Sequence, residues 1–127
     1  MLEGRKWVEN GRLLRHRSSM DEAVMGDVTV KAEVRLLPAS ESGRIDPIRG
    51  SYRPNHNFFG PDDLNMTAGA IDLPDGCELH PGQSMEATIT FLGWTGLADQ
   101  VYQGREWRIQ EGVRLIGIGR VIEVLSP

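Results

Sequence analysis

The residue types that most often perform catalysis or hold metal ions are few and scattered in this 127-residue sequence. Its three histidines, His16, His56 and His80, and its one cysteine, Cys77, lack the spacing typical of zinc sites. Asp62-Asp63 lies in a predicted turn, whereas paired-carboxylate catalysis needs burial and a defined separation. We therefore expect neither a structural metal nor an enzyme.

The glycine-rich motifs that bind nucleotides are also missing from the sequence. A P-loop needs Gly-x-x-x-x-Gly-Lys-Ser/Thr, because backbone amides cradle the phosphate and the lysine reaches its terminal oxygens. The only lysines, Lys6 and Lys31, do not follow a glycine. The pair Gly117 and Gly119 has Ile122 where a dinucleotide motif has glycine, and no helix is predicted after it. We expect no cofactor and no bound nucleotide.

Charge is distributed unevenly along the chain. The overall net charge is -4, but residues 1–17 hold five lysines and arginines against two glutamates, a net +3 that leaves -7 for the other 110 residues. An acidic body needs a local basic patch to bind nucleic acid, because affinity for phosphates comes from cationic groups. No apolar run could span a membrane or form a signal peptide. The sequence thus favours a cytoplasmic protein that is neither membrane-bound nor a general RNA binder.

Alternation of apolar and polar residues predicts six β-strands. The clearest covers 28–36, where the alternation is strict over nine positions. Others are predicted within 52–59, with an edge or bulge at Pro54, and within 66–73, 85–91, 107–109 and 116–124. In the last strand, one face is expected to carry Ile116, Ile118, Ile122 and Val124. Because 15 glycines and 7 prolines mark many turns and no core helix is evident, we predict one all-β domain over 27–127, a closed six-stranded antiparallel barrel.

Residues 1–26 do not continue this pattern. Trp7-Val8 and Leu13-Leu14 flank Asn10-Gly11, which is a strong hairpin signal, and Ser19-x-x-Glu22 could cap one helical turn. Two interpretations stay open: a small N-terminal hairpin arm, or a linker remnant or artificial leader sequence.

A series of short motifs occurs in order from Val30 almost to the C-terminus. They are Ala32-Glu33-Val34, Ser42-Gly43-Arg44 with Pro47, Gly50-Ser51-Tyr52-Arg53-Pro54, Phe58-Phe59, Gly69-Ala70-Ile71-Asp72-Leu73-Pro74, Pro81-Gly82, Ile109-Gln110-Glu111-Gly112-Val113-Arg114 and Gly117-Ile118-Gly119-Arg120-Val121. Together they resemble the C-terminal (third) β-barrel domain of translation elongation factor Tu, here as a stand-alone domain. The resemblance implies a bacterial protein connected with translation.

The resemblance also implies where a ligand would bind. In that family the barrel contacts its own GTPase domain, an exchange factor and aminoacyl-tRNA. Carried over to this sequence, the nucleic-acid side would include Arg44, Asn55, Gly112 and Arg114. Arg53, between an aromatic residue and a proline of fixed φ, could form a buried or interfacial ion pair.

Two departures from the family pattern weaken such a tRNA site. Ile45 stands where a histidine is usual, and Glu86 stands where a phosphate-facing lysine is expected. A carboxylate beside a phosphate adds repulsion where the family has attraction.

Three hypotheses for function follow. The first is a non-catalytic module that uses this barrel to bind a protein partner connected with translation. The second is binding of aminoacyl-tRNA or ribosome-associated RNA through Arg44, Arg53 and the basic N-terminal segment. The third is a fragment or divergent relative without an independent function. Fold resemblance alone does not decide between them.

Overall fold

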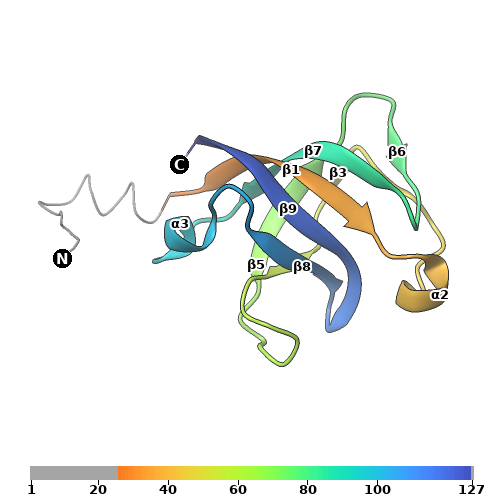
Figure 1. Ribbon diagram of the computed structural model, residues 1–127, viewed down its shortest axis with the longest axis horizontal. Coiled ribbons are helices and arrows are strands. Elements are labelled where there is room, and N and C mark those ends of the chain that lie inside the picture. Colours follow the sequence, from red (N-terminus) through yellow and green to blue (C-terminus); the bar gives the residue numbers. More distant parts are fainter. Residues whose placement is uncertain (1–25, 127) are drawn as a thin grey trace, which may run out of the picture.

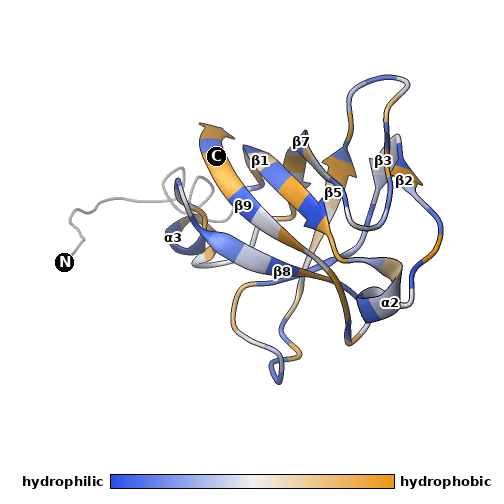
Figure 2. Ribbon diagram, turned by 45° about the vertical axis from the view of Figure 1, so that its right-hand side comes forward, coloured by the Kyte–Doolittle hydropathy of each residue, from blue (hydrophilic) through white to orange (hydrophobic). Residues whose placement is uncertain are grey.

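The strict alternation at 28–36 forms one long strand of the structure, a computed structural model that describes residues 26–126 (Figure 1). In β1 (Val28–Leu36) the apolar residues are buried and the intervening polar residues face outward. Figure 2 shows the same change between hydrophobic and hydrophilic residues along the ribbon. One face of this strand is therefore available for a core and the other for charged side chains.

Six antiparallel strands close into a barrel. Around the barrel the order is β5-β4-β8-β9-β1-β7, and β7 pairs again with β5. The predicted closed six-stranded antiparallel barrel is confirmed. Besides β1, its strands are β4 (Asn55–Asn57), β5 (Thr67–Asp72), β7 (Ser84–Phe91), β8 (Glu106–Glu111) and β9 (Arg114–Ser126).

Pro54 interrupts one of these strands, near the predicted irregularity. The short β3 (Ser51–Tyr52) pairs with β5 through Tyr52 and Ile71, and β4 pairs with β5 through Asn55 and Ala68. Both pairings keep the same register, so β3 and β4 follow one line along β5. Because proline has no N–H to donate, the ladder is broken between them.

Several short elements have no counterpart in the prediction. A two-stranded sheet joins β2 (Ile48–Arg49) to β6 (Glu78–Leu79). Two four-residue helices, α2 (Ala39–Ser42) and α3 (Leu97–Gln100), lie in connections between strands, and Leu97 is fully buried. None of the helices in residues 26–126 is long enough to cross a membrane. The N-terminal segment predicted for 1–26 lies, apart from Gly26, outside the described residues.

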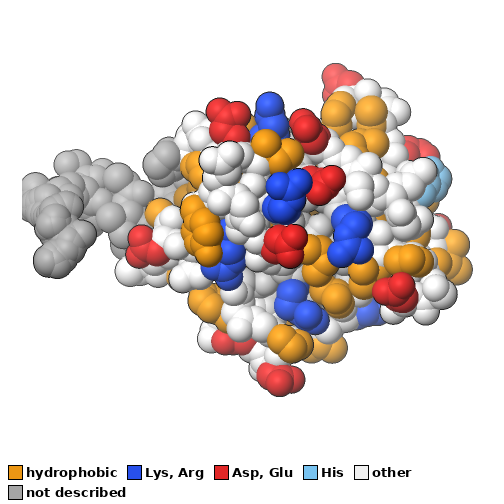
Figure 3. Space-filling view, in the orientation of Figure 1, with side chains coloured by type: hydrophobic (Ala, Val, Ile, Leu, Met, Phe, Trp, Pro, Cys, Tyr) orange, Lys and Arg blue, Asp and Glu red, His pale blue; other side chains and the backbone are white. Residues whose placement is uncertain are grey.

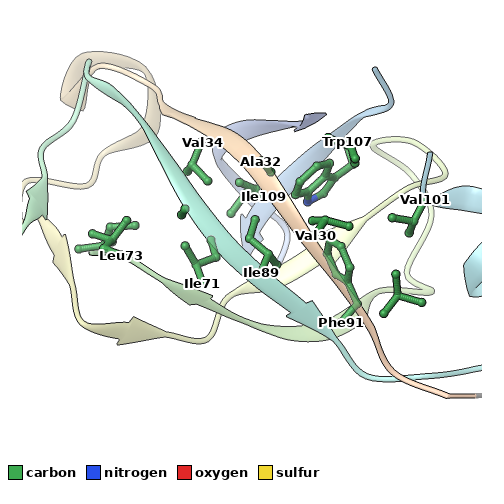
Figure 4. Close-up of a cluster of buried hydrophobic side chains, with 14 of the residues drawn as sticks. Val30, Ala32, Val34, Ile71, Leu73, Ile89, Phe91, Val101, Trp107 and Ile109 are labelled. Carbon is green, nitrogen blue, oxygen red and sulfur yellow. The ribbon is translucent and has the colours of Figure 1, made fainter. Parts of the chain in front are cut away.

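The barrel interior is filled by inward-facing side chains from all sides (Figure 4). Val30, Val34, Ile71 and Ile89 are among its completely buried members. At one end the filling is aromatic: the rings of Phe58, Phe91 and Trp107 have centroids 5.3 to 5.8 Å apart.

The predicted inner face of the last strand is wrong beyond Ile116. Inward positions in β9 are Gly117, Gly119 and Val121, while Ile118 and Ile122 are only half-buried and Val124 is exposed. The cause is an irregularity in the pairing of β8 with β9: Ile109 pairs with Gly117 and Gln110 with Leu115, so Ile116 is skipped. Both glycines leave room for a neighbour: a Cβ on Gly117 would lie 2.7 Å from the Arg35 carbonyl oxygen, and one on Gly119 would lie 2.3 Å from the Trp107 ring.

Strand register defines two opposite ends of the barrel. β1 begins beside the last residue of β7, and the loops 58–66 and 92–105 lie at this end, which we call the aromatic end. β1 finishes beside the start of β7 and of β9. There lie the 37–50 connection and the β8–β9 turn, and we call this the arginine end.

Candidate interaction site

Glu111, the last residue of β8, is the centre of a polar cluster at the arginine end. Its carboxylate accepts hydrogen bonds from the Tyr52 hydroxyl and from the guanidinium of Arg44. Arg114, across the tight turn, donates from Nη2 to the other carboxylate oxygen at 2.8 Å. The Arg44 guanidinium also lies over the Tyr52 ring, 5.0 Å from its centroid. One carboxylate thus holds two arginines and a tyrosine together.

Local backbone geometry fixes the position of Arg44. α2 ends at Gly43, whose φ of 76° is in the left-handed region that glycine adopts readily. The buried Ser42 hydroxyl then accepts the Arg44 N–H at 3.1 Å. Arg44 Nε donates to the Asp46 carbonyl at 3.0 Å. The side chain is therefore anchored from its own loop as well as by Glu111.

The turn that carries Gly112 is also held from inside the barrel. Gly112 has a φ of 61°, and its carbonyl accepts a hydrogen bond from Nε2 of the buried Gln110 at 3.1 Å. This turn joins β8 to β9. It places Arg114 on the same carboxylate as Arg44.

The cluster's electrostatics favour a charged Glu111 and a neutral Tyr52. Partial burial alone would raise the pKa of Glu111, but hydrogen bonds from Tyr52 and Arg114 and the charges of Arg44 and Arg114 hold that pKa below its ordinary value. Burial, followed by the hydrogen bond to Glu111, raises the pKa of the Tyr52 hydroxyl. Two positive guanidinium groups and one negative carboxylate give the cluster a net charge of +1.

Two bulky apolar side chains project beside this cluster. Ile45, next to Arg44, is 81% exposed, and Val113, next to Arg114, is 76% exposed. Exposed apolar side chains next to a fixed ion-pair network form a mixed surface of the kind found at protein interfaces. Such a surface is better suited to a protein ligand than to the phosphate backbone of a nucleic acid.

The other predicted site residues lie elsewhere on the barrel. Arg53 and Asn55 line a hollow of about 320 Å³ over the outside of β4, β5 and β7, together with Asp27, Ala68, Thr90 and Leu92. Arg53 is exposed and forms no ion pair within residues 26–126, so the buried alternative is not observed there and the interfacial one stays a prediction. It is Arg44 that forms the ion pair next to Tyr52.

Glu86 lies on a third part of the surface, the outside of β7. In the strand register it stands directly opposite Glu33 of β1, and Glu33 in turn contacts Arg120 of β9 at 3.3 Å. Glu86 also borders a hollow of about 440 Å³ with Lys31, Asp72 and Asp75. Figure 3 shows positive and negative side chains interspersed over the face that β1, β8 and β9 present. The structure thus brings together Arg44, Gly112 and Arg114, but not Arg53, Asn55 or Glu86.

The role of Glu111 was absent from the sequence prediction. Its partners Arg44 and Tyr52 are 67 and 59 residues away in the chain. Only the pairing of distant strands brings Glu111 close to these partners, and no local sequence motif predicts that contact. Within residues 26–126 no group of three or more histidine, cysteine or acidic side chains is placed to hold a metal ion. No family model matches the chain.

Proposed function

We propose that this chain is a non-catalytic module that binds a protein partner connected with translation. The observation that carries the proposal is the surface at the arginine end, where exposed Ile45 and Val113 flank the Arg44–Glu111–Arg114 network. Apolar contact area supplies affinity, and fixed guanidinium groups supply orientation. The cluster is pre-ordered by its internal hydrogen bonds, which lowers the entropic cost of binding.

The ordered motifs from Val30 onward support the translation connection. They are those that resemble the C-terminal barrel of elongation factor Tu, which itself contacts other protein domains. A free barrel of that kind could mimic the factor towards one of its partners or join a separate assembly. We propose that it does so in the cytoplasm, without a cofactor or a bound nucleotide.

A second candidate is binding of aminoacyl-tRNA or ribosome-associated RNA. The half-exposed guanidinium of Arg114 favours it, since Arg44 lies at the same end of the barrel. Against it, Glu111 already neutralises one of these two charges, and Glu86 faces the carboxylate of Glu33 rather than a lysine or arginine. Phosphate contacts need cations, so this surface is better suited to a protein.

The test is affinity capture from a lysate of the source organism with the full chain as bait, with and without nuclease. We expect protein partners to be retained after nuclease treatment and lost with the double variant Ile45→Ser/Val113→Ser. The matched control is Thr88→Ala, an exposed position in the middle of β7 away from both barrel ends, which should leave recovery unchanged. Recovery that disappears with nuclease would favour RNA instead. If the double variant captures the same proteins as the wild type, the proposed surface is refuted.

A further inference from the structure

Exposed apolar side chains gather at the aromatic end, away from the surface proposed above. Of the eight large hydrophobic residues that are exposed within 26–126, only Ile45 and Val113 lie at the arginine end. The other six are Phe59, Leu64, Leu92, Tyr102, Val124 and Leu125. Such a concentration on a small domain marks an interaction surface.

A pocket of about 430 Å³ opens at this end of the barrel, with Phe59 as one of its walls. It is lined by Phe59, Asn65, Met66, Thr67 and Trp94. The rings of Phe59 and Trp94 are tilted against each other with centroids 5.9 Å apart. The volume is large enough for a bulky apolar side chain together with neighbouring atoms of the same ligand, and the aromatic walls supply apolar contact.

Hydrogen bonds hold the loop that presents Phe59. The side-chain amide of buried Asn57 donates to the Gly60 carbonyl at 2.7 Å and to the Asp63 carbonyl at 3.2 Å. Its oxygen accepts the backbone N–H groups of Phe59 and Gly60 at 2.9 and 3.2 Å. One buried side chain thus ties both ends of this turn, so little ordering of the loop is needed on binding.

The opposite wall is held as well. The indole N–H of Trp94 donates to the Thr67 hydroxyl at 2.8 Å, and Asp27 accepts the backbone N–H of the preceding Gly93 at 2.8 Å. Both aromatic walls are therefore fixed before a ligand arrives.

The charge around the pocket is negative. In residues 26–27 and the loops 58–66 and 92–105, the charged side chains are four aspartates, Asp27, Asp62, Asp63 and Asp99, against Arg105. The Arg105 guanidinium donates hydrogen bonds to the carbonyl of Phe58 and, at 3.0 Å, to the side-chain oxygen of Gln100. Asp62 and Asp63 directly follow Phe59, Gly60 and Pro61 and line an adjoining hollow. A ligand that enters beside Phe59 therefore meets carboxylates.

We propose that the Phe59–Trp94 pocket is a second docking site, which binds a segment of a partner protein that presents one bulky apolar side chain beside lysine or arginine. The apolar side chain enters the pocket and packs against the two rings that line it, and the basic group lies against Asp62 and Asp63. The site is separate from the arginine end, so it is independent of the function proposed there.

The probe is a library of random peptides displayed on phage and selected on the immobilised full chain. We expect the enriched peptides to share a bulky apolar residue within two positions of lysine or arginine. A synthetic peptide of that consensus should bind Phe59→Ser at least about tenfold more weakly, equivalent to 1.4 kcal/mol. Enriched peptides without a basic residue, or no enrichment, would overturn the proposal.

Charge variants keep the test sharp if Phe59→Ser fails to fold. The double variant Asp62→Asn/Asp63→Asn removes two charges but keeps an oxygen that can accept the Asn65 N–H at residue 63. This double variant should weaken peptide binding severalfold and reduce the dependence of the affinity on salt. Ile45→Ser/Val113→Ser is the matched control and should bind normally. Equal affinity in the wild type and the charge variant would contradict the site, whereas loss in the control would move binding to the arginine end.

NMR distinguishes this pocket from other sites. On peptide addition, the indole N–H resonance of Trp94 should shift, while that of Trp107, which is bonded inside the barrel, should not. The chain's own residues 1–25 are an alternative occupant. If Leu13→Ser/Leu14→Ser in the full chain strengthened peptide binding, those residues would be the ligand and the proposed external partner would be wrong.

Discussion

The indole N–H of Trp107 donates a hydrogen bond to Nδ1 of His56 at 3.0 Å inside the barrel. The other ring nitrogen, Nε2, lies 3.1 Å from the Gly69 carbonyl. Because Nδ1 accepts, the proton of the neutral ring is on Nε2, where it is donated to that carbonyl. A second proton would break the bond to Trp107.

Stability should therefore fall as pH drops below neutrality. Burial lowers the pKa of His56 from 6.5 to about 4, so between these values the unfolded chain binds the extra proton and the folded chain does not. The stabilisation is complete above pH 6.5 and is lost as pH falls towards 4, with about 2 kcal/mol gone by pH 5. Urea unfolding at pH 7.5 and 5 measures it. His56→Gln should flatten this dependence, and an equally steep dependence in that variant would rule out His56 as its source.

Gly119→Ala should destabilise the barrel strongly. The new Cβ would lie 2.3 to 2.6 Å from three atoms of the Trp107 ring, which is buried and fixed by His56. Overpacking of this kind costs about 1–3 kcal/mol, and we expect the upper part of that range. Thr88→Ala, on the exposed face of β7, serves as the control in urea unfolding. Trp107→Phe should recover part of the Gly119→Ala loss, and simple additivity of the two changes would argue against the clash.

Glu111→Gln should loosen the arginine end. The change removes the charge that holds Arg44 and Arg114, and hydrogen bonds to charged groups contribute about 1.5–3 kcal/mol. Because the folded pKa of Glu111 is lowered, its contribution is present above pH 4.5 and is lost as pH falls through the folded value. Glu78→Gln breaks an exposed pair with Arg49 and should cost below about 1 kcal/mol. If both variants lose equal stability in urea unfolding, the cluster has no special role.

Glu86→Lys should stabilise the fold whatever the chain binds. The substitution turns the Glu33–Glu86 cross-strand pair from like to opposite charges, which is worth about 0.2–1 kcal/mol. Glu86→Gln should gain less, and high salt should reduce the difference between the two variants in thermal unfolding. A gain for Gln equal to that for Lys would show that the two carboxylates do not interact.

The same variant tests the RNA alternative. If this face lies against a phosphate, Glu86→Lys should strengthen tRNA binding and increase the magnitude of the logarithmic salt slope by about 0.7 to 0.9. Glu86→Gln controls for loss of the carboxylate. Unchanged tRNA affinity in both would mean that residue 86 faces no phosphate.

Periodic strands were predictable because their signal is local. In β1 and β7 each second residue enters the core, and the sequence alone shows that alternation. β2 and β6 are two residues each, too short to show a period. In β9 the inward positions include Gly117 and Gly119, which hydrophobic patterning cannot score.

Contacts between distant segments were not predictable in the same way. The Glu111 cluster joins side chains from three separate parts of the chain, and no spacing rule connects them. Likewise, Phe58 packs in the core while the adjacent Phe59 forms a pocket wall, a distinction that the Phe58-Phe59 motif does not contain.

The opposite placement of the two barrel ends has a consequence for avidity. β1 connects them with nine residues, which at about 3.3 Å per step from one residue to the next gives a strand length of roughly 26 Å. A barrel of this length acts as a rigid spacer, so two ligands would not compete for room. A single partner with a docking element for each end would need a tether of at least that span. With such a tether, the second contact would form at an effective concentration in the millimolar range, which raises the overall affinity. Shortening the tether would abolish this gain in affinity without altering either contact.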